Sequence, residues 1–152
     1  MIKSNFNSHC SCGSTRFSIK GQPLLRAYCH CTICQTFNQA SYADITLFKS
    51  SDVIKPQKGM VEFKSYKSPA ILQRGRCISC GGAAIEYLKV PLLELIVVPS
   101  KNIHEESFVP APSLHIFYNR RVSDIHDSLP KYSGYIKSQL AFGHVLFASM
   151  LR

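Results

Sequence analysis

Seven cysteines are the residues of this chain best suited to chemistry, and they fall in three short motifs. The motifs are Cys10-Ser11-Cys12, Cys29-His30-Cys31-Thr32-Ile33-Cys34 and Cys77-Ile78-Ser79-Cys80. Closely spaced cysteines bring several sulfurs within reach of one metal ion, and soft thiolate ligands suit zinc. An odd number of cysteines cannot pair completely into disulfides within one chain. The spacing therefore predicts metal binding rather than a disulfide framework.

The first and third motifs can together close one tetrahedral site. Cys10 and Cys12 supply two sulfurs, and Cys77 and Cys80 supply two more, which leaves no position for a substrate. Gly81 follows the last of these cysteines, where glycine can adopt the positive φ of a tight turn. We predict a structural zinc site here.

The second motif supplies three thiolates from Cys29, Cys31 and Cys34. A zinc ion held by three sulfurs keeps a fourth position for water, a histidine, a thiol or a carbonyl, and such an open site can do chemistry. Three alternatives remain open: Cys29 and Cys34 join the four-sulfur site, the triplet holds a second structural zinc, or it is reduced and empty. His30 is expected to point away from a shared metal, behind the ligands or toward solvent, because side chains alternate along extended backbone.

Short segments rich in β-branched and aromatic residues separate these motifs, and turns that carry proline separate the later segments. The sequence therefore predicts a mainly β, mostly antiparallel fold that the zinc sites hold together. A single helical turn is expected over 35–40. The predicted strands are 16–20, 25–28, 42–48, 61–66, 71–74, 84–88, 92–98 and 114–118.

The C-terminal segment reads as the one longer helix of the chain. Ile136, Leu140, Phe147 and Leu151 recur at near-helical spacing, although Gly143 interrupts the pattern. We expect a zinc-binding domain over residues 1–135 and an apolar extension over residues 136–152. The extension is expected to pack on its own domain by default, or else on the partner in a homodimer.

The chain is basic, with a formal net charge of +9 that would attract a small acidic substrate or nucleic acid. Lys64, Lys67, Arg74 and Arg76 surround Tyr66, and they form either a solvated strand face or a surface for anions. The first residues, MIKSNF, lack the apolar stretch of a secretory signal, and no run reaches the length of a membrane span. We therefore expect a cytoplasmic protein with no membrane partner.

The motifs CSCG, CHCTIC and CISCGG, in this order, resemble those of the glutathione-dependent formaldehyde-activating enzyme family, which includes centromere protein V. The resemblance extends from His9 to Tyr132. It implies a twisted β fold called a β-tent and two zinc ions per chain. It also implies a structural zinc on the four outer cysteines and a catalytic zinc on Cys29, Cys31 and Cys34.

The resemblance implies a zinc-dependent carbon–sulfur lyase that joins glutathione, a small thiol, to formaldehyde and so gives S-hydroxymethylglutathione. The rival hypothesis is a non-catalytic zinc module whose basic surface contacts nucleic acid or protein. A third hypothesis is that the triplet senses zinc or oxidants, because bound thiolates can be oxidised and then release the ion.

Overall fold

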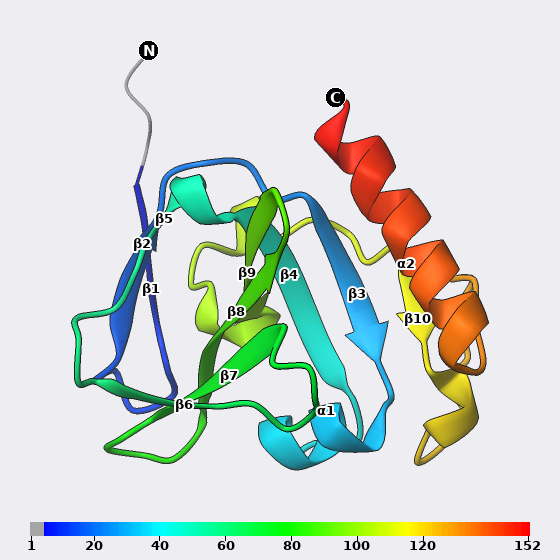
Figure 1. The fold of residues 1–152 in the computed structure, drawn as a ribbon, viewed down its shortest axis with the longest axis horizontal. Coiled ribbons are helices and arrows are strands. Elements are labelled where there is room, and N and C mark those ends of the chain that lie inside the picture. Colours follow the sequence, from blue (N-terminus) through cyan, green and yellow to red (C-terminus); the bar gives the residue numbers. More distant parts are fainter. Residues whose placement is uncertain (1–4) are drawn as a thin grey trace.

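The computed structural model describes residues 5–152, which form two β-sheets and two α-helices (Figure 1). Helix α1 is Thr32–Asn38 and helix α2 is Tyr135–Met150. The larger sheet contains, in spatial order, β10 (Leu114–Ile116), β3 (Leu25–Cys29), β4 (Ala43–Lys49), β9 (Leu93–Pro99), β8 (Ala83–Val90), β7 (Leu72–Cys77) and β6 (Val61–Lys64). The smaller sheet contains β1 (Phe6–His9), β2 (Arg16–Ile19) and β5 (Val53–Ile54).

Neighbouring strands are antiparallel except at one edge, where β10 runs parallel to β3. Short 3₁₀ turns connect several of the strands. They are η1 (Ser50–Asp52), η2 (Ser100–Asn102), η3 (Glu106–Phe108) and η4 (Tyr118–Arg120).

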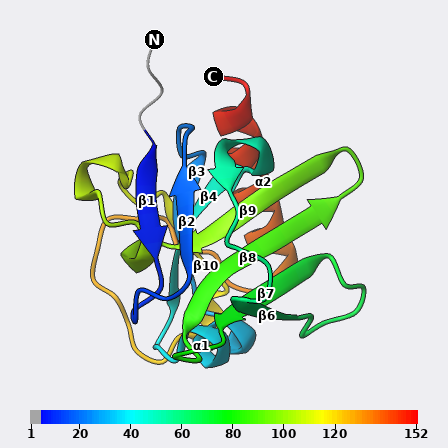
Figure 2. The same ribbon diagram turned by 90° about the vertical axis from the view of Figure 1, so that its left-hand side faces the viewer.

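The central strands of the larger sheet are buried on both faces. In β4, Leu47 faces one apolar core and Phe48 faces the other, and in β9 Val97 and Val98 divide in the same way. Helix α2 packs against the first core, and the smaller sheet covers the second (Figures 1 and 2). This double burial explains why these strands read as nearly continuous apolar runs rather than as alternating ones.

Helix α2 lies along the outer edge of the molecule against β10 and β3 (Figure 1). Phe142, Val145 and Leu146 pack on the first core. The start of the helix is fixed by the buried Ser138, whose Oγ accepts a hydrogen bond of 2.8 Å from the backbone N–H of Phe117. The extension therefore packs on its own chain, and Gly143 does not break the helix.

The predicted mainly β fold and C-terminal helix are confirmed, and each predicted strand overlaps an observed one. Strands β1 and β5 were not predicted, because Phe6 is the one apolar residue of β1 and β5 is only two residues long. The predicted strand 114–118 ends at Ile116, since Phe117 adopts the left-handed conformation with φ of 54° and turns the chain into η4.

The predicted turn over 35–40 is in fact helix α1, which begins three residues earlier, inside the second cysteine motif. The Sγ of Cys31 accepts a hydrogen bond from the backbone N–H of Cys34 at 3.3 Å and so caps the helix. The sequence reasoning treated this segment only as a metal-binding loop and missed its second role as a helix start.

No helix among residues 5–152 is long and apolar enough to cross a bilayer. The prediction made from MIKSNF falls largely on residues 1–4, which lie outside the described residues.

Candidate metal centres

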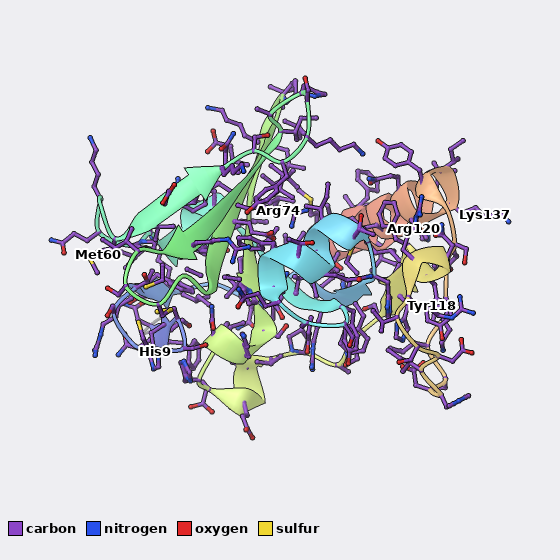
Figure 3. All side chains as sticks on the ribbon, turned by 90° about the horizontal axis from the view of Figure 1, so that it is seen from below. His9, Met60, Arg74, Tyr118, Arg120 and Lys137 are labelled. Atoms are coloured by element: carbon purple, nitrogen blue, oxygen red, sulfur yellow. The ribbon has the colours of Figure 1, made fainter. Side chains whose placement is uncertain are left out.

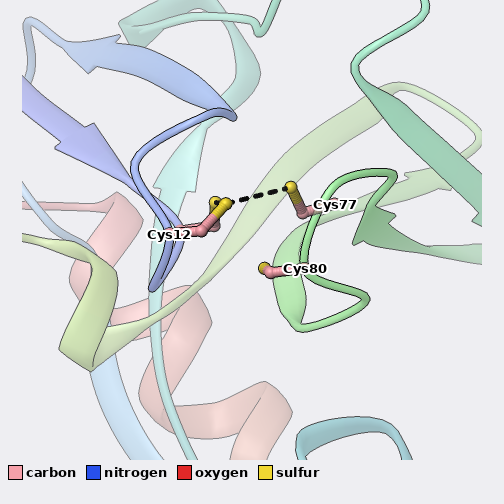
Figure 4. Close-up of side chains that lie close together, drawn as sticks. Cys12, Cys77 and Cys80 are labelled. Carbon is pink, nitrogen blue, oxygen red and sulfur yellow. Dashed lines mark hydrogen bonds between the residues drawn. The ribbon is translucent and has the colours of Figure 1, made fainter.

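The structure brings the first and third cysteine motifs together into a four-sulfur cluster. The sulfurs of Cys10, Cys12, Cys77 and Cys80 all lie within 4.8 Å of one another. The Sγ–Sγ distance is 3.5 Å between Cys10 and Cys12 and 3.7 Å between Cys12 and Cys77, the contact drawn in Figure 4. Zinc–sulfur bonds of about 2.3 Å in a tetrahedron place the sulfurs about 3.8 Å apart, so this donor set fits zinc.

Two glycine turns shape this cluster. Gly13 and Gly81 have φ angles of 80° and 70°, as expected for the turns, and their backbone N–H groups donate to the carbonyls of Cys10 and Cys77. The backbone N–H of Thr15 donates to the Sγ of Cys10 at 3.4 Å. Burial raises the pKa of the Cys77 thiol, but hydrogen bonds from neighbouring residues outweigh it and lower the pKa to about 6. The hydrogen bonds to Cys77 therefore favour its thiolate, which is the form that binds a metal.

The second motif forms a separate three-sulfur cluster. The sulfurs of Cys29 at the end of β3, Cys31 before α1, and Cys34 within α1 lie within 4.8 Å of one another. No histidine nitrogen among residues 5–152 joins this group at that distance. Cys29 and Cys34 are buried, and Cys31 is partly exposed. The cluster is therefore open to solvent on the Cys31 side.

The thiols of the triplet differ in their pKa values. Hydrogen bonds from Cys29 and Cys34 lower the pKa of Cys31 to about 2. The pKa of Cys29 is raised well above its usual range by its hydrogen bonds to Cys31 and Cys34 and by burial. A metal ion bound to all three sulfurs would have to displace the protons of the two buried thiols, so its affinity should rise with pH.

A buried ion pair adjoins this cluster. Nη1 of Arg74 on β7 lies 2.5 Å from Oε1 of Glu86 on β8 and 3.6 Å from the Sγ of Cys34. The two charged side chains are only 10% and 4% exposed. Burial raises the pKa of Glu86, and Arg74 opposes that rise. Seen from below, Arg74 lies between the strands and helix α1 (Figure 3).

Arg74 gives the three-sulfur cluster a fixed positive charge that is largely buried. Arginine remains protonated in proteins, and its fork of N–H donors can serve two acceptors at once. Here the two acceptors are the Cys34 sulfur and the Glu86 carboxylate. Cys77, which belongs to the four-sulfur cluster, lies three residues further along β7, so the Cα atoms of Arg74 and Cys77 are about 10 Å apart and this strand borders both clusters.

A buried hydrogen-bond chain holds the middle of the second motif. Nε2 of His30 lies 2.8 Å from Nδ1 of His115, and Nε2 of His115 lies 2.8 Å from Oδ2 of Asp127. Because the carboxylate only accepts, Nε2 of His115 donates to Asp127; when His115 is neutral, its Nδ1 accepts and His30 donates from Nε2. The pKa of Asp127 is lowered by its hydrogen bonds with Lys131 and His115.

His30 thus lies behind the cysteines rather than in solvent, with 1% of its surface exposed, and the solvent-facing alternative was wrong. Its backbone N–H donates to the carbonyl of Ile116 on β10. These two hydrogen bonds of His30, to His115 and to Ile116, therefore hold the segment between Cys29 and Cys31 against β10.

Replacing Asp127 by asparagine should lower stability in a pH-dependent way. The folded pKa of Asp127 is depressed, so its contribution is fully present above the ordinary aspartate pKa and is lost as pH falls through the folded value. The difference in unfolding free energy between wild type and Asp127→Asn should therefore be largest near neutral pH and shrink as the pH falls below about 4, the ordinary aspartate pKa. Urea titrations of both proteins at a series of pH values measure it. A difference that grows on acidification would contradict this role.

One residue of the predicted basic surface is buried instead. Lys64 and Lys67 are exposed and Arg76 is half-buried, but Arg74 points inward to its ion pair and is not part of that surface. The sequence reasoning missed Glu86 and Asp127. The signal for Glu86 was available, because one acidic residue in the otherwise apolar strand segment AAIEYL indicates a buried charge that needs a partner.

An open depression of about 680 Å³ lies at the other end of the larger sheet, between the β8–β9 turn and the end of α2. Its lining includes Lys49, Leu93 and Met150 but no cysteine. Strand β4 runs from Ala43, opposite Cys29, to Lys49, which places the depression about 20 Å from the triplet. The depression is therefore separate from both sulfur clusters.

Comparison with known proteins gives one family match. A sequence model of the family described as glutathione-dependent formaldehyde-activating enzyme matches residues 5–120, a range that contains all seven cysteines and excludes α2. A crystal structure of a Rhodobacter sphaeroides protein superimposes with a TM-score of 0.52 at 14% identity, over 70% of this chain and 97% of the other, which supports the fold alone. No curated protein matches the sequence.

Proposed function

Because the chain belongs to the glutathione-dependent formaldehyde-activating enzyme family, we propose that it joins a small thiol, with glutathione as the first candidate, to formaldehyde. The reaction forms a carbon–sulfur bond between the thiol and the carbonyl carbon, and the thiol proton ends on the carbonyl oxygen. The reverse reaction makes the protein a carbon–sulfur lyase. The observation that carries the proposal is the division of the cysteines into a four-sulfur cluster and a separate, partly open three-sulfur cluster.

We assign the two clusters different roles. Cys10, Cys12, Cys77 and Cys80 would hold a structural zinc, since four sulfurs fill its tetrahedron. Cys29, Cys31 and Cys34 would hold the second zinc, which when bound would lower the pKa of a thiol or polarise a carbonyl. The substrates would approach from the Cys31 side, because the other two cysteines of the triplet are buried.

The remaining residues tune and hold the second cluster. Arg74 offsets the negative charge that three thiolates concentrate at one point, and Glu86 fixes the direction of the guanidinium. The net charge of +9 raises the local concentration of an anionic thiol such as glutathione. The rival hypothesis of a nucleic-acid-binding module loses support from the structure. That hypothesis depended on a basic surface, and Arg74 is not part of that surface.

The test compares wild type with Cys34→Ser. We expect zinc content to fall from two ions per chain to one, with the fold retained and glutathione-dependent formaldehyde consumption reduced to the uncatalysed rate. Elemental analysis of protein purified without chelator gives the first number, and appearance of S-hydroxymethylglutathione by NMR gives the second. Thr36→Ser, on the exposed side of the same helix, is the matched control and should keep both properties.

Two results would reject parts of this proposal. One zinc ion in both wild type and Cys34→Ser would show that the triplet holds no metal. Two ions in wild type without thiol-dependent loss of formaldehyde would reject glutathione chemistry, and would leave the sensing hypothesis to be tested by peroxide-driven zinc release.

A further inference from the structure

Helix α2 has a second apolar face that points away from the domain. Ile136, Leu140, Phe147 and Leu151 are 71%, 70%, 64% and 72% exposed. Gly143 and His144 lie on the same side and are also exposed. These six residues are called the outer stripe below. At 100° per residue they cover an arc of about 100°, opposite the face that packs on the core.

An apolar helix face of this width normally packs against something. Helices that are apolar on opposite sides are found inside proteins, where both faces are covered. Within residues 5–152 nothing covers the outer stripe. Helix α2 itself lies along the outer edge of the molecule (Figure 1). The stripe also lies beyond residue 120, where the family match ends, so its apolar character is not required by the zinc-binding domain.

The order of residues in the outer stripe is symmetric about one point. Ile136 and Leu151 are equally far from the midpoint between Gly143 and His144, and so are Leu140 and Phe147. When two identical helices pack antiparallel about a two-fold axis, each residue meets its mate at the same distance on the other side of that axis. The stripe is thus complementary to itself.

The centre of the stripe suits a close approach of two helices. A side chain added at Gly143 would meet nothing within 4 Å, so the backbone there is open to a neighbour. None of the six residues carries a formal charge at neutral pH, although the chain as a whole is at +9. Their spacing of three or four residues is that of helices that pack nearly in line along their length.

We propose that the outer stripe is the interface of a homodimer, in which two α2 helices pack antiparallel about an axis between Gly143 and His144. The contact extends along a helix of 16 residues, about 24 Å. One pair of helices buries less surface than a standard interface, so monomer and dimer exchange reversibly.

Sedimentation of the full chain over a range of concentrations tests the proposal. The mass should rise from the 17.0 kDa of one chain toward twice that value as concentration increases. Leu140→Glu and Phe147→Lys should each raise the dimer dissociation constant by tenfold or more. Both side chains are exposed in the single chain, so each variant should keep the circular dichroism spectrum and zinc content of wild type.

Mixing variants tests the antiparallel register itself. Residue 140 of one chain faces residue 147 of the other, so L140E mixed with F147K should form a mixed dimer held by one ion pair and one native contact. L140E mixed with L140K puts the charges at positions that do not meet, and should remain monomeric. Rescue of the second mixture instead of the first would overturn the register.

Two further outcomes would overturn the interface. A wild type that stays monomeric at every concentration rejects it, and co-sedimentation of that monomer with vesicles of phosphatidylcholine and phosphatidylserine would instead assign the stripe to a lipid surface. A dimer that L140E and F147K leave unchanged lies on another face of the molecule. Because both tests use association rather than turnover, their failure leaves the proposed chemistry untouched.

Discussion

Cys80→Ser is expected to unfold the protein. The Cys80 side chain is exposed, so the substitution removes little packing, and a surface change of this kind ordinarily alters stability by about 0.5 kcal/mol or less. As one of the four proposed zinc ligands, however, it would close the first tetrahedron. A structural zinc contributes about 10–16 kcal/mol of apparent binding free energy, which is comparable to the whole net stability of a domain, roughly 5–15 kcal/mol.

Circular dichroism and the dispersion of a ¹H–¹⁵N NMR spectrum measure the loss of fold directly. Ser79→Ala is the control, since Ser79 is equally exposed and neighbours the same cysteine without offering a ligand. Treating wild type with a strong chelator should reproduce the Cys80→Ser spectrum. If Cys80→Ser retains the wild-type spectrum and unfolds at the same urea concentration, the four-sulfur cluster does not stabilise the fold through a metal.

Arg74→Met is expected to lower the unfolding free energy by about 3–5 kcal/mol, because it leaves the Glu86 carboxylate buried without its partner. The double variant Arg74→Met, Glu86→Leu should recover most of this loss, since an apolar pair can replace a buried ion pair at little cost. Urea denaturation of wild type and the two variants gives the comparison. Equal losses in the single and double variants would show that the buried charge is not the cause.

The loss of unfolding free energy in Arg74→Met should also depend on pH. Without Arg74, burial raises the folded pKa of Glu86 further above its unfolded value. A raised carboxyl pKa favours the folded state below the unfolded pKa, and this advantage is lost as pH rises through the folded value. The destabilisation of Arg74→Met should therefore grow from acid toward neutral pH.

The zinc content of Arg74→Met should fall as well, because Arg74 no longer offsets the charge of the triplet.

The sequence was sufficient for the parts of this protein that depend on local chemistry. Cysteines two or three residues apart can reach the same ion in almost any fold, and Gly13 and Gly81 mark turns because few other residues tolerate their positive φ. Apolar runs such as residues 95–98 indicate a strand that is buried on both sides, and spacing near 3.6 residues indicated α2.

The tertiary structure alone decided which separated residues meet. Spacing left open whether Cys29 and Cys34 join the four-sulfur cluster, and the fold places these two in the first core and Cys10 and Cys77 in the second. The pairing of β7 with β8 sets Arg74 opposite Glu86, although its neighbours along the sequence made it look like part of a basic surface. His30 and Asp127 are almost a hundred residues apart, and only the parallel pairing of β10 with β3 brings His115 between them. Such contacts depend on strand order and register, which are fixed by the burial of the whole chain rather than by any local pattern.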